Sequence, residues 1–574
     1  MTSGARGHNR RKFLGVAGGL AGAALTGWTP AFQLPAEAAT LPTPPNFPGS
    51  IPLGQQAYQN WSEQIDFDAV WTATPATAAD VVTLANWAHG NGYRLRAKGM
   101  QHNWSPILLP EGADASRVIL VDTTAKLTGL SVTAGSPATA TVQSGTSIDD
   151  LQAGLEQAGY GLLECTAPGD LTVGGVLAIG GHGSGVPATG ETRPAGGAYG
   201  SLANLVHSLT AVVWNGSAYV LKTFSRTNSD IGAFLVHLGR AFVTEVTLQV
   251  IPNQRLRCQN WCDVSATDLF GPPGDTSTLD NYLTAAGRVE AIWFPFTGPP
   301  WLKVWSVSPA KPALSREIDA PYPYTFANFL TQQEADFLKE VEEGDTSGTP
   351  AFTNAEMALV GSGLITTGTW DVWGWSKNTL LYVQPTTLRI VEGGWAVLTR
   401  RADVQQVLHE FFHQYQSVLS TFQAAGEFPM NGPIEIRITG IDTTAEVAVT
   451  GAVEPLLSPV RPRPDHPEWD TCVWLDMGTL PGTPTALEFY TEMETWIWQH
   501  YSGDYAAVRP EWSKAWAHAA AGAWTDQSVI TGTIPAAFRA GQPDSADWDT
   551  ARTILNAYDP ARVFSNPFLD VLLP

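Results

Sequence analysis

The order of apolar and polar positions predicts a compact α/β unit near the start of the chain. Residues 69–73 predict a strand, and Thr77 then begins a helix whose apolar residues recur with a period near 3.6. Glycines at 90 and 92 end this helix, and a second strand is predicted at 93–97. The pattern further predicts strands at 118–122 and 138–143, a short helix at 148–158, and a hairpin around Asn215-Gly216.

Beyond Arg255 the pattern predicts antiparallel strands that contain tryptophan, together with long amphipathic helices. The strands are predicted at 289–296 and 302–307, and the helices at 331–343 and 402–422. The last forty or so residues combine turn residues with aromatic ones and are expected to return to the first domain. We therefore expect an α+β chain with a first domain at 54–255, a second at 256–530, and a C-terminal segment at 531–574.

Composition restricts the class of protein. The chain has 574 residues, of which 44% are hydrophobic and 15% charged, as in a globular protein of several domains. Its net charge of −22 argues against nucleic acid as a partner, because nucleic acid requires clustered Lys and Arg. The 22 tryptophans fit either a large core or the lining of a site for a flat apolar ligand. The four cysteines are too few for a disulfide scaffold and match no zinc site.

The N-terminus has the order of an export signal. Arg10 and Arg11 precede a mildly apolar run from Gly15 to Gly27, and Ala36-Glu37-Ala38 supplies a small-x-small cleavage site. The apolar run is too short and weak to span a membrane. Residues 1–39 are therefore expected to be a twin-arginine signal, and the protein to be secreted from a bacterium. That route carries folded proteins, which fits a cofactor bound before export.

The stretch 171–185 reads LTVGGVLAIGGHGSG and contains six glycines. Glycine has no Cβ, so such a run allows backbone N–H groups to turn toward a bulky anion such as a diphosphate. Tight turns in a structural β region are the alternative. The run lacks the G-x-G-x-x-G spacing of a Rossmann site.

Several ordered motifs resemble the FAD-binding domain of the vanillyl-alcohol oxidase family. They are the loop KGMQHNWSP at 98–106, the run PGDLTVGGVLAIGGHGSG at 168–185, Tyr199-Gly-Ser201, and LGRAFVTEVT at 238–247. The resemblance implies FAD, covalently bound through His102, and a cysteinyl link is not expected because Asp170 stands where bicovalent relatives carry cysteine. It implies these further cofactor-binding residues: Gly99, Met100, Gln101, Asn103, Trp104, Ser105, Pro168, Gly169, Asp170, Thr172, Gly174, Gly175, Gly180, Gly181, His182, Gly183, Ser184, Gly185, Gly200, Val243 and Asn566.

The second half is similar to the covalent-flavin (type II) cholesterol oxidases. Glu290 in RVEAIWFPF, Glu435 and Arg437 in GPIEIRITG, and Glu511 with Lys514 in RPEWSKAW support this similarity. Alternation along 434–438 places Glu435 and Arg437 on one face of a strand. Such a pair is ordinarily a surface ion pair, which contributes little to stability. If the two charges instead lie in an aromatic cavity, each shifts the pKa of the other, as a catalytic pair requires.

The resemblance implies oxidation of a 3β-hydroxysterol, with O2 reduced to H2O2 and the 5-ene moved to the conjugated 4-ene. Glu435 is expected to be the base, Arg437 its electrostatic partner, and Glu290 second in line for proton transfer. Glu511 and Lys514, one helical turn apart, are expected to pair near the channel to the flavin. Asp476 stands where relatives may carry an amide, and its effect is left open. The partners expected are a sterol, O2 and, at most transiently, a membrane.

Two alternatives belong to other classes. A sugar or lactone oxidase of the same superfamily would need a polar pocket in the second domain. His409-Glu410-Phe-Phe-His413 matches the H-E-x-x-H motif of zinc peptidases, but the helix around it also offers a broad apolar stripe for burial. We expect no metal.

Overall fold

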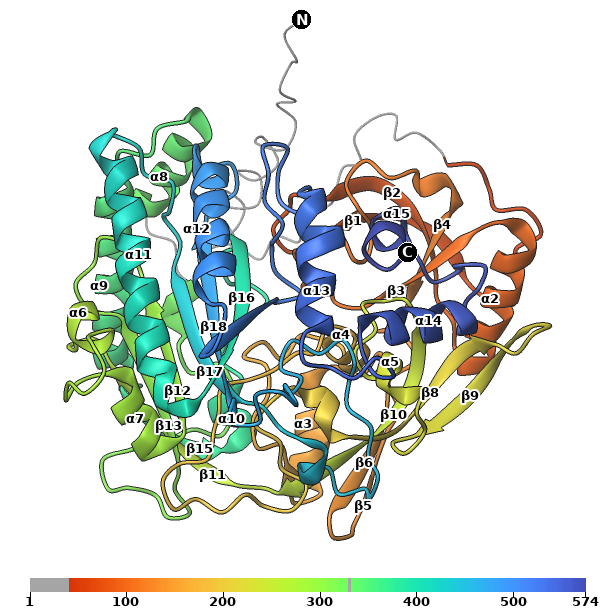
Figure 1. Ribbon diagram of the computed structural model, residues 1–574, viewed down its shortest axis with the longest axis horizontal. Helices are drawn as coiled ribbons and strands as arrows, with labels where there is room; N and C mark the ends of the chain where they lie inside the picture. The colour runs from red at the N-terminus through yellow and green to blue at the C-terminus, as the bar shows by residue number, and fades with distance from the viewer. Residues whose placement is uncertain (1–40, 329–331) are drawn as a thin grey trace, which may run out of the picture.

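The computed structural model describes residues 41–328 and 332–574, and the expected export signal at 1–39 lies outside them. Figure 1 shows two lobes side by side, with the N-terminal half of the chain in one and the green and cyan segments in the other. Within the described ranges, no helix combines the length and the apolar character that crossing a bilayer requires. The two lobes contain three sheets between them, and the functional groups lie on particular faces of these sheets.

A small four-stranded sheet opens the first lobe, in the order β1-β2-β4-β3. The helix predicted after Thr77 is α2, and Thr77 and Asp80 form a reciprocal capping box at its start. It ends at Gly92, whose φ of 69° is the left-handed conformation that glycine adopts without strain. The elements are β1 (Leu53–Gln59), β2 (Asp66–Ala73), α2 (Ala78–Asn91), β3 (Arg94–Lys98) and β4 (Val118–Asp122).

The second sheet of this lobe runs in the order β5-β6-β10-β8-β9, and β7 pairs with β10. Its central strands bury an apolar cluster against the short helices beside it. The predicted hairpin is confirmed as β8 and β9. The elements are β5 (Leu130–Thr133), β6 (Ala138–Gln143), α3 (Ile148–Gln157), β7 (Tyr160–Gly161), α4 (Val173–Ala178), β8 (Val206–Trp214), β9 (Tyr219–Ser225), α5 (Ile231–Leu235) and β10 (Phe242–Pro252).

The second lobe is built on a nine-stranded sheet in the order β14-β15-β11-β13-β12-β17-β18-β16-β19, antiparallel apart from the β14–β15 pair. The strands are β11 (Arg255–Trp261), β12 (Arg288–Trp293), β13 (Trp301–Val307), β14 (Arg316–Glu317), β15 (Asp371–Trp375), β16 (Val391–Thr399), β17 (Ile434–Gly440), β18 (Thr471–Thr479) and β19 (Ala506–Pro510). The strand expected at 289–296 is shorter than predicted, because the chain turns at Phe296, where φ is 65°.

Helices cover one face of this sheet, as Figure 1 shows for α11 and α12. Apolar residues of α7, α11 and α12 pack there against Ile434, Ile436 and Ile438 of β17. The helices of this lobe are α6 (Ala266–Leu269), α7 (Leu279–Ala286), α8 (Gln332–Glu343), α9 (Thr349–Thr367), α10 (Ser376–Leu380), α11 (Val404–Ala424) and α12 (Ala486–His500). Since side chains alternate along a strand, the remaining residues of β17 point toward the first lobe.

The C-terminal segment crosses back to the first lobe, where Figure 1 shows its blue helices. It contains α13 (Ile534–Arg539), α14 (Trp548–Tyr558) and α15 (Pro567–Leu572). Val563 and Phe564 belong to the same apolar cluster as Leu95 of β3, and Leu95 N donates to Val563 O at 2.8 Å. Short helical turns lie at Ala115–Arg117, Leu202–Leu205, Thr325–Asn328, Arg401–Asp403, Thr444–Glu446 and, as a π turn, Val529–Thr533.

Candidate active site

Two adjoining cavities lie between the glycine run, the loop after β3, and the uncovered face of the nine-stranded sheet. The larger has a volume of about 290 Å³ and the smaller about 170 Å³. Both are lined by His102, Leu171, Val176 and Ile179, so they meet at His102. The larger cavity has a mainly apolar wall that includes several tryptophans, and the charged residues of the sheet line part of it.

The smaller cavity contains polar groups suited to a polar ligand. Within the part of the chain that the structure describes, the buried atoms Gln101 Oε1, Ser105 Oγ and Ser144 Oγ have no hydrogen-bond partner. Buried polar atoms are normally paired, so these three fit a ligand that supplies the partners. The predicted cofactor residues that line this cavity are Gly99, Met100, Gln101, His102, Asn103, Ser105, Thr172, Gly174, Gly175 and Val243.

His102 is held flat against a tryptophan that the sequence analysis did not consider. The rings of Trp61 and His102 are stacked, with centroids 3.7 Å apart and planes 12° apart. Burial lowers the pKa of His102, although the Asp170 carboxylate at 3.9 Å from its Nδ1 raises it. The imidazole is therefore neutral at neutral pH, which leaves one ring nitrogen as a nucleophile.

The glycine run forms a short helix, α4, between two turns, and its glycines serve mainly close packing. A Cβ on Gly183 would lie 2.5 Å from Cys165 O, and one on Gly174 would lie 2.7 Å from the Ser144 Cβ. The backbone N–H groups of the run bind protein oxygens at Gly174, Gly175, Gly180, Gly181 and Gly185. The expectation that the run turns its N–H groups toward an anion is therefore wrong for these five glycines.

Other residues expected to bind the cofactor line the larger cavity, and some line neither. Trp104, Pro168, Gly181, His182, Gly183 and Ser184 line the larger one. Gly169, Asp170, Gly180, Gly185, Gly200 and Asn566 are among the lining residues of neither. Asn566 instead caps α15 and donates from Nδ2 to Ile107 O at 2.8 Å, so it holds the loop after β3 in place. Gly200 N binds Asp442 Oδ2 at 2.7 Å.

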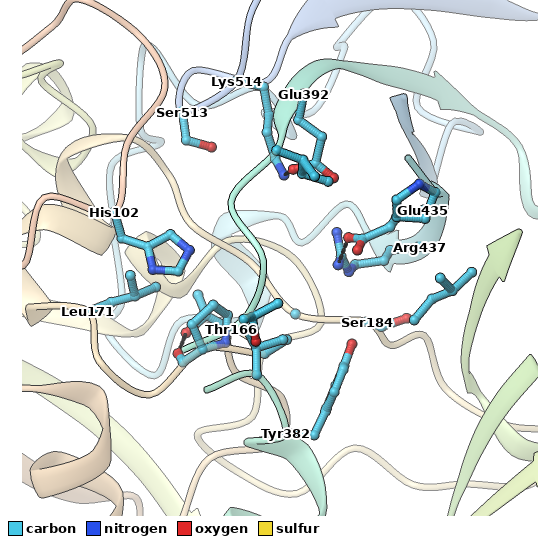
Figure 2. A pocket seen from close by; sticks show the side chains of 18 of the residues that line it. His102, Thr166, Leu171, Ser184, Tyr382, Glu392, Glu435, Arg437, Ser513 and Lys514 are labelled. Atoms are coloured by element: carbon cyan, nitrogen blue, oxygen red, sulfur yellow. Dashed lines mark hydrogen bonds and ion pairs between the residues drawn. The ribbon is translucent and has the colours of Figure 1, made fainter. Parts of the chain in front are cut away.

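Glu435 and Arg437 project from β17 into the larger cavity, as their alternation predicts, and Figure 2 shows them side by side. Cross-strand register sets Arg437 opposite Glu290 of β12, and Glu435 opposite Asp476 of β18. Arg437 donates to the Glu435 carboxylate, to Glu290 Oε1 at 2.8 Å and to Asp476 Oδ2 at 3.1 Å. Burial lowers the pKa of Arg437, but the carboxylates raise it by more than burial lowers it. The guanidinium therefore remains charged.

Glu290 lies behind Arg437 and is not among the residues that line the cavities. Only 1% of its surface is exposed, and its second oxygen accepts a hydrogen bond from the Tyr382 hydroxyl. Both carboxylate oxygens are thus occupied by protein groups. Because Glu290 is buried behind Arg437 and lines neither cavity, it does not face a ligand directly, and its proton-transfer role stays a prediction.

Lys514 is paired with a carboxylate that the sequence analysis missed. Residues 511–514 form a turn after β19 and no helix, so the expected helical spacing with Glu511 is wrong. The Lys514 ammonium binds Glu392 of β16 and lies 3.8 Å from Asp476 Oδ2. Figure 2 shows Lys514 and Glu392 together at one side of the cavity. Burial raises the pKa of Glu392 to about 7, against the opposing effect of Lys514.

Carboxyl groups outnumber cationic groups around Lys514 and Arg437. Glu392, Glu435 and Asp476 place one oxygen each within 4.8 Å of one another. Arg437 and Lys514 are the cations that lie among them. Burial, with Glu511 adding to it, raises the pKa of Asp476 well above its usual value. Asp476 is thus harder to ionise than an ordinary aspartate, and its Oδ2 accepts a hydrogen bond from Arg437.

His182 belongs to the structural frame of the larger cavity. Its ring stacks on Trp474 of β18, with centroids 3.6 Å apart and planes 7° apart, and its Nδ1 lies 2.9 Å from Gly183 O. Its Nε2 lies 3.9 Å from Glu511 Oε1. Burial raises the pKa of Glu511, but the neighbouring His182 and the charge of Lys514 lower it more, so Glu511 is ionised.

One signal in the sequence could have identified Glu392, whereas none identifies Tyr382. Glu392 precedes Gly393 and Gly394 in a buried strand, and a Cβ on Gly394 would lie 2.6 Å from Asp476 Oδ1 and 2.7 Å from Lys514 Cγ. The glycine pair makes room for the charges. Tyr382 follows α10 in a loop with no distinctive pattern, and only the fold brings it to Glu290.

The H-E-x-x-H motif lies on α11, on the helix-covered side of the sheet. His409 and His413 have their ring centroids 4.4 Å apart, and His409 Nδ1 lies 3.0 Å from Phe270 O. Glu410 binds Tyr505 and His500 instead of facing the two histidines. The motif arises from a helix that buries its apolar stripe.

Known proteins match both halves of the chain. The family model described as "Cholesterol oxidase, substrate-binding" matches residues 255–574, and the FAD binding domain model matches residues 71–222. A solved solvent-stable cholesterol oxidase has a TM-score of 0.92 and 52% identity, covering 93% of this chain and 100% of that one. Cholesterol oxidase from B. sterolicum has a TM-score of 0.92 and 45% identity, covering 94% and 100%.

Curated relatives match a smaller share of the chain, at lower identity. L-gulonolactone oxidases from Bos taurus and Mus musculus are each 26% identical over 245 residues, which is 42% of this chain and 48% of theirs. The chain thus spans about half the length of the curated relatives that it matches.

Proposed function

The chain belongs to the cholesterol oxidase family, and on this premise we propose that it oxidises the 3β-hydroxyl group of a sterol to a ketone. The observation that carries the proposal is the Glu435–Arg437 pair at the wall of a cavity that is otherwise apolar and aromatic. A rigid apolar ligand with one hydroxyl group matches that distribution of polar and apolar surface.

The cofactor of this family, FAD, fits the pair of adjoining cavities. The unpaired polar atoms of the smaller one suit the dinucleotide, and the apolar larger one suits the flavin ring with a sterol. When bound, FAD supplies the acceptor for the hydride of the alcohol carbon and, with O2, the route to H2O2. The protein must therefore bind the sterol, accept the hydroxyl proton and stabilise the alkoxide charge.

Glu435 accepts the hydroxyl proton in this proposal, and Arg437 offsets the negative charge that develops on the oxygen. Glu435 lines the cavity and has one oxygen bound by Arg437, which orients the carboxylate. Asp476 and the Glu392–Lys514 pair lie beside these two residues.

Migration of the double bond also falls to Glu435, since Glu290 has both oxygens engaged. Glu435 first releases the hydroxyl proton, which is consumed in forming H2O2. The carboxylate then takes the C4 proton, the C5=C6 double bond shifts to C4=C5, and the proton is returned to C6. No electron or proton is gained or lost in this step. Glu290 then serves to hold Arg437.

His102 is the proposed point of covalent attachment for the flavin. A neutral imidazole, packed flat against Trp61 at the meeting of the two cavities, supports this proposal. Export through the twin-arginine route, followed by brief contact with a membrane to extract the sterol, is proposed on the pattern of residues 1–39 and the apolar cavity.

A comparison of substrates tests the function. The purified protein is expected to produce peroxide with cholesterol and other 3β-hydroxysterols and none with a panel of sugar alcohols and lactones. The relatives that oxidise L-gulonolactone make sugar-type substrates the second candidate. Peroxide with the sugar panel and none with any 3β-hydroxysterol would reverse the assignment.

A further inference from the structure

Lys303 is a buried lysine in the middle of the nine-stranded sheet, and the reaction proposed above does not use it. It lies on β13, between Asn260 of β11 and Glu290 of β12 as its cross-strand neighbours. The residue is completely inaccessible to solvent. Its side chain lies on the same face as Trp301 and Trp305, two positions away on either side.

Aromatic rings surround the ammonium group of Lys303. Its Nζ lies 3.7 Å from the ring centre of Tyr324, 4.0 Å from that of Tyr382, and 4.5 Å from that of Trp301. The Asn260 Oδ1 lies 3.5 Å away. Among the described residues no carboxylate forms an ion pair with Lys303, so the rings are its principal stabilising partners.

Keeping a charge in this position is unfavourable. Burial lowers the pKa of Lys303 to about 8, with smaller opposing effects of Cys258 and Glu290. An apolar side chain would fill the space without the cost of desolvating an ammonium. The charge therefore does something that an apolar residue would not.

Tyr382 connects this aromatic cage to the charged residues of the cavity. Its ring contacts the Lys303 ammonium, and its hydroxyl donates to Glu290 Oε2. Figure 2 shows the hydroxyl end of Tyr382 directed toward the Glu435–Arg437 pair. Its backbone N–H binds Ala167 O at 3.1 Å, in the loop that leads to the glycine run. Burial raises the pKa of Tyr382 well above its usual value, so its hydroxyl stays a donor.

We propose that Lys303 and Tyr382 are positioning residues that act on Arg437 through Glu290. The ammonium fixes the Tyr382 ring, the Tyr382 hydroxyl fixes one oxygen of Glu290, and the other oxygen fixes Arg437 Nε at 2.8 Å. Without the cage, Glu290 can rotate, and Arg437 loses the contact that aims it at the alcohol oxygen. This inference rests on the proposed role of Arg437 in sterol oxidation.

Two variants test the chain of contacts. Tyr382→Phe removes the hydroxyl, and Lys303→Met removes the charge at nearly constant length. Tyr382→Phe loses a hydrogen bond to the Glu290 carboxylate, which predicts a fall in kcat of about tenfold or more. Lys303→Met removes the cation that holds the Tyr382 ring, so a fall in kcat in the same direction is expected. The KM for cholesterol is expected to change by less than about twofold, because the apolar wall remains. Removing the buried charge should leave the Tm of Lys303→Met equal to or above that of the parent protein.

The matched control is Tyr490→Phe, which removes a buried phenol hydroxyl on the helix-covered face of the same sheet. That hydroxyl donates to Met477 O at 2.7 Å and lines neither cavity. This variant is expected to lose some stability and to keep kcat within about twofold. Crystal structures of Tyr382→Phe and Lys303→Met are expected to show Arg437 displaced from Glu290.

The outcomes separate this inference from the proposed function. If the parent protein makes no peroxide with any 3β-hydroxysterol, the proposed function fails, and the crystal structures still test the positioning. If the parent is active, an unchanged kcat in Tyr382→Phe or an undisplaced Arg437 overturns the inference. A lower Tm together with equal losses in kcat and in sterol affinity assigns Lys303 to stability alone and also overturns it.

Discussion

The Lys514 ammonium, on the turn after β19, binds the Glu392 carboxylate of β16, and both side chains are buried. Burial lowers the pKa of Lys514, but Glu392 and Asp476 together raise it more, so the lysine is charged. The pair thus connects the turn after β19 to β16 at the wall of the larger cavity.

Removing one member of this pair should be more harmful than removing both. Glu392→Gln or Lys514→Met alone leaves a buried charge without its partner, and a loss of about 3–5 kcal/mol in the free energy of unfolding is expected. The double variant should recover a large part of that loss. Chemical denaturation of the three variants measures this, and strictly additive losses would show that the two side chains do not interact.

Asp476→Asn should be tolerated, since burial disfavours the ionised form of Asp476 in the folded protein. Its raised pKa means that its contribution to stability is fully present below the unfolded pKa of about 3.9 and is lost as pH rises through the folded pKa. Asparagine keeps a neutral donor and does not titrate. As pH rises from about 4, the Tm of the parent should therefore fall relative to that of the variant. Parallel Tm curves from about pH 4 upward would contradict a raised pKa of Asp476.

Arg437 should affect turnover more than it affects binding of the sterol. Arg437→Met removes the positive charge from the alcohol oxygen and is expected to lower kcat by about 10²–10³-fold. Arg437→Lys keeps the charge but cannot contact Glu290, Glu435 and Asp476 together, so an intermediate kcat is expected. Steady-state peroxide assays give both constants, and a higher KM at unchanged kcat would place Arg437 in binding alone.

Trp61 should influence the attachment of the flavin to His102. His102→Ala is expected to release all yellow colour on acid precipitation, whereas the parent keeps it on the polypeptide. Trp61→Leu removes the ring that holds the imidazole, and a smaller attached fraction is expected. Absorbance of the washed precipitate measures this. Complete attachment in Trp61→Leu would show that the stacking does not orient His102.

Chelation of metals should leave the protein unaffected. Glu410 faces Tyr505 and His500, so the H-E-x-x-H motif of α11 lacks its general base. Dialysis against EDTA is therefore expected to change neither Tm nor peroxide production. A loss of either that zinc restores would revive the metal-site alternative.

Local patterns in the sequence predict much of the fold. The capped helix after Thr77 and the alternation along β17 both appear as predicted, because each depends on contacts within a few residues. The turn at 511–514 was predicted wrongly as helical, since spacing alone cannot show that the preceding strand ends at Pro510.

The candidate site is less accessible to sequence reasoning. Glu435 and Arg437 are apparent from their strand, but Glu392, Tyr382 and Trp61 reach the cavities only through pairings between distant segments. The glycine run shows the same limit. Its glycines allow neighbouring backbones to approach, and this requirement cannot be distinguished from anion binding without knowing the neighbours.

The return of the C-terminal segment to the first lobe has a consequence for assembly of the cofactor site. Val563 and Phe564 complete the core around β3, and Asn566 binds the loop that carries His102. A fragment ending at residue 255 would expose that core and leave the loop unsupported. The flavin site is thus completed by residues that are synthesised after the whole second lobe. We therefore expect the cofactor to bind at the last stage of folding. An isolated first lobe should bind the cofactor only when the C-terminal segment is supplied as a second chain.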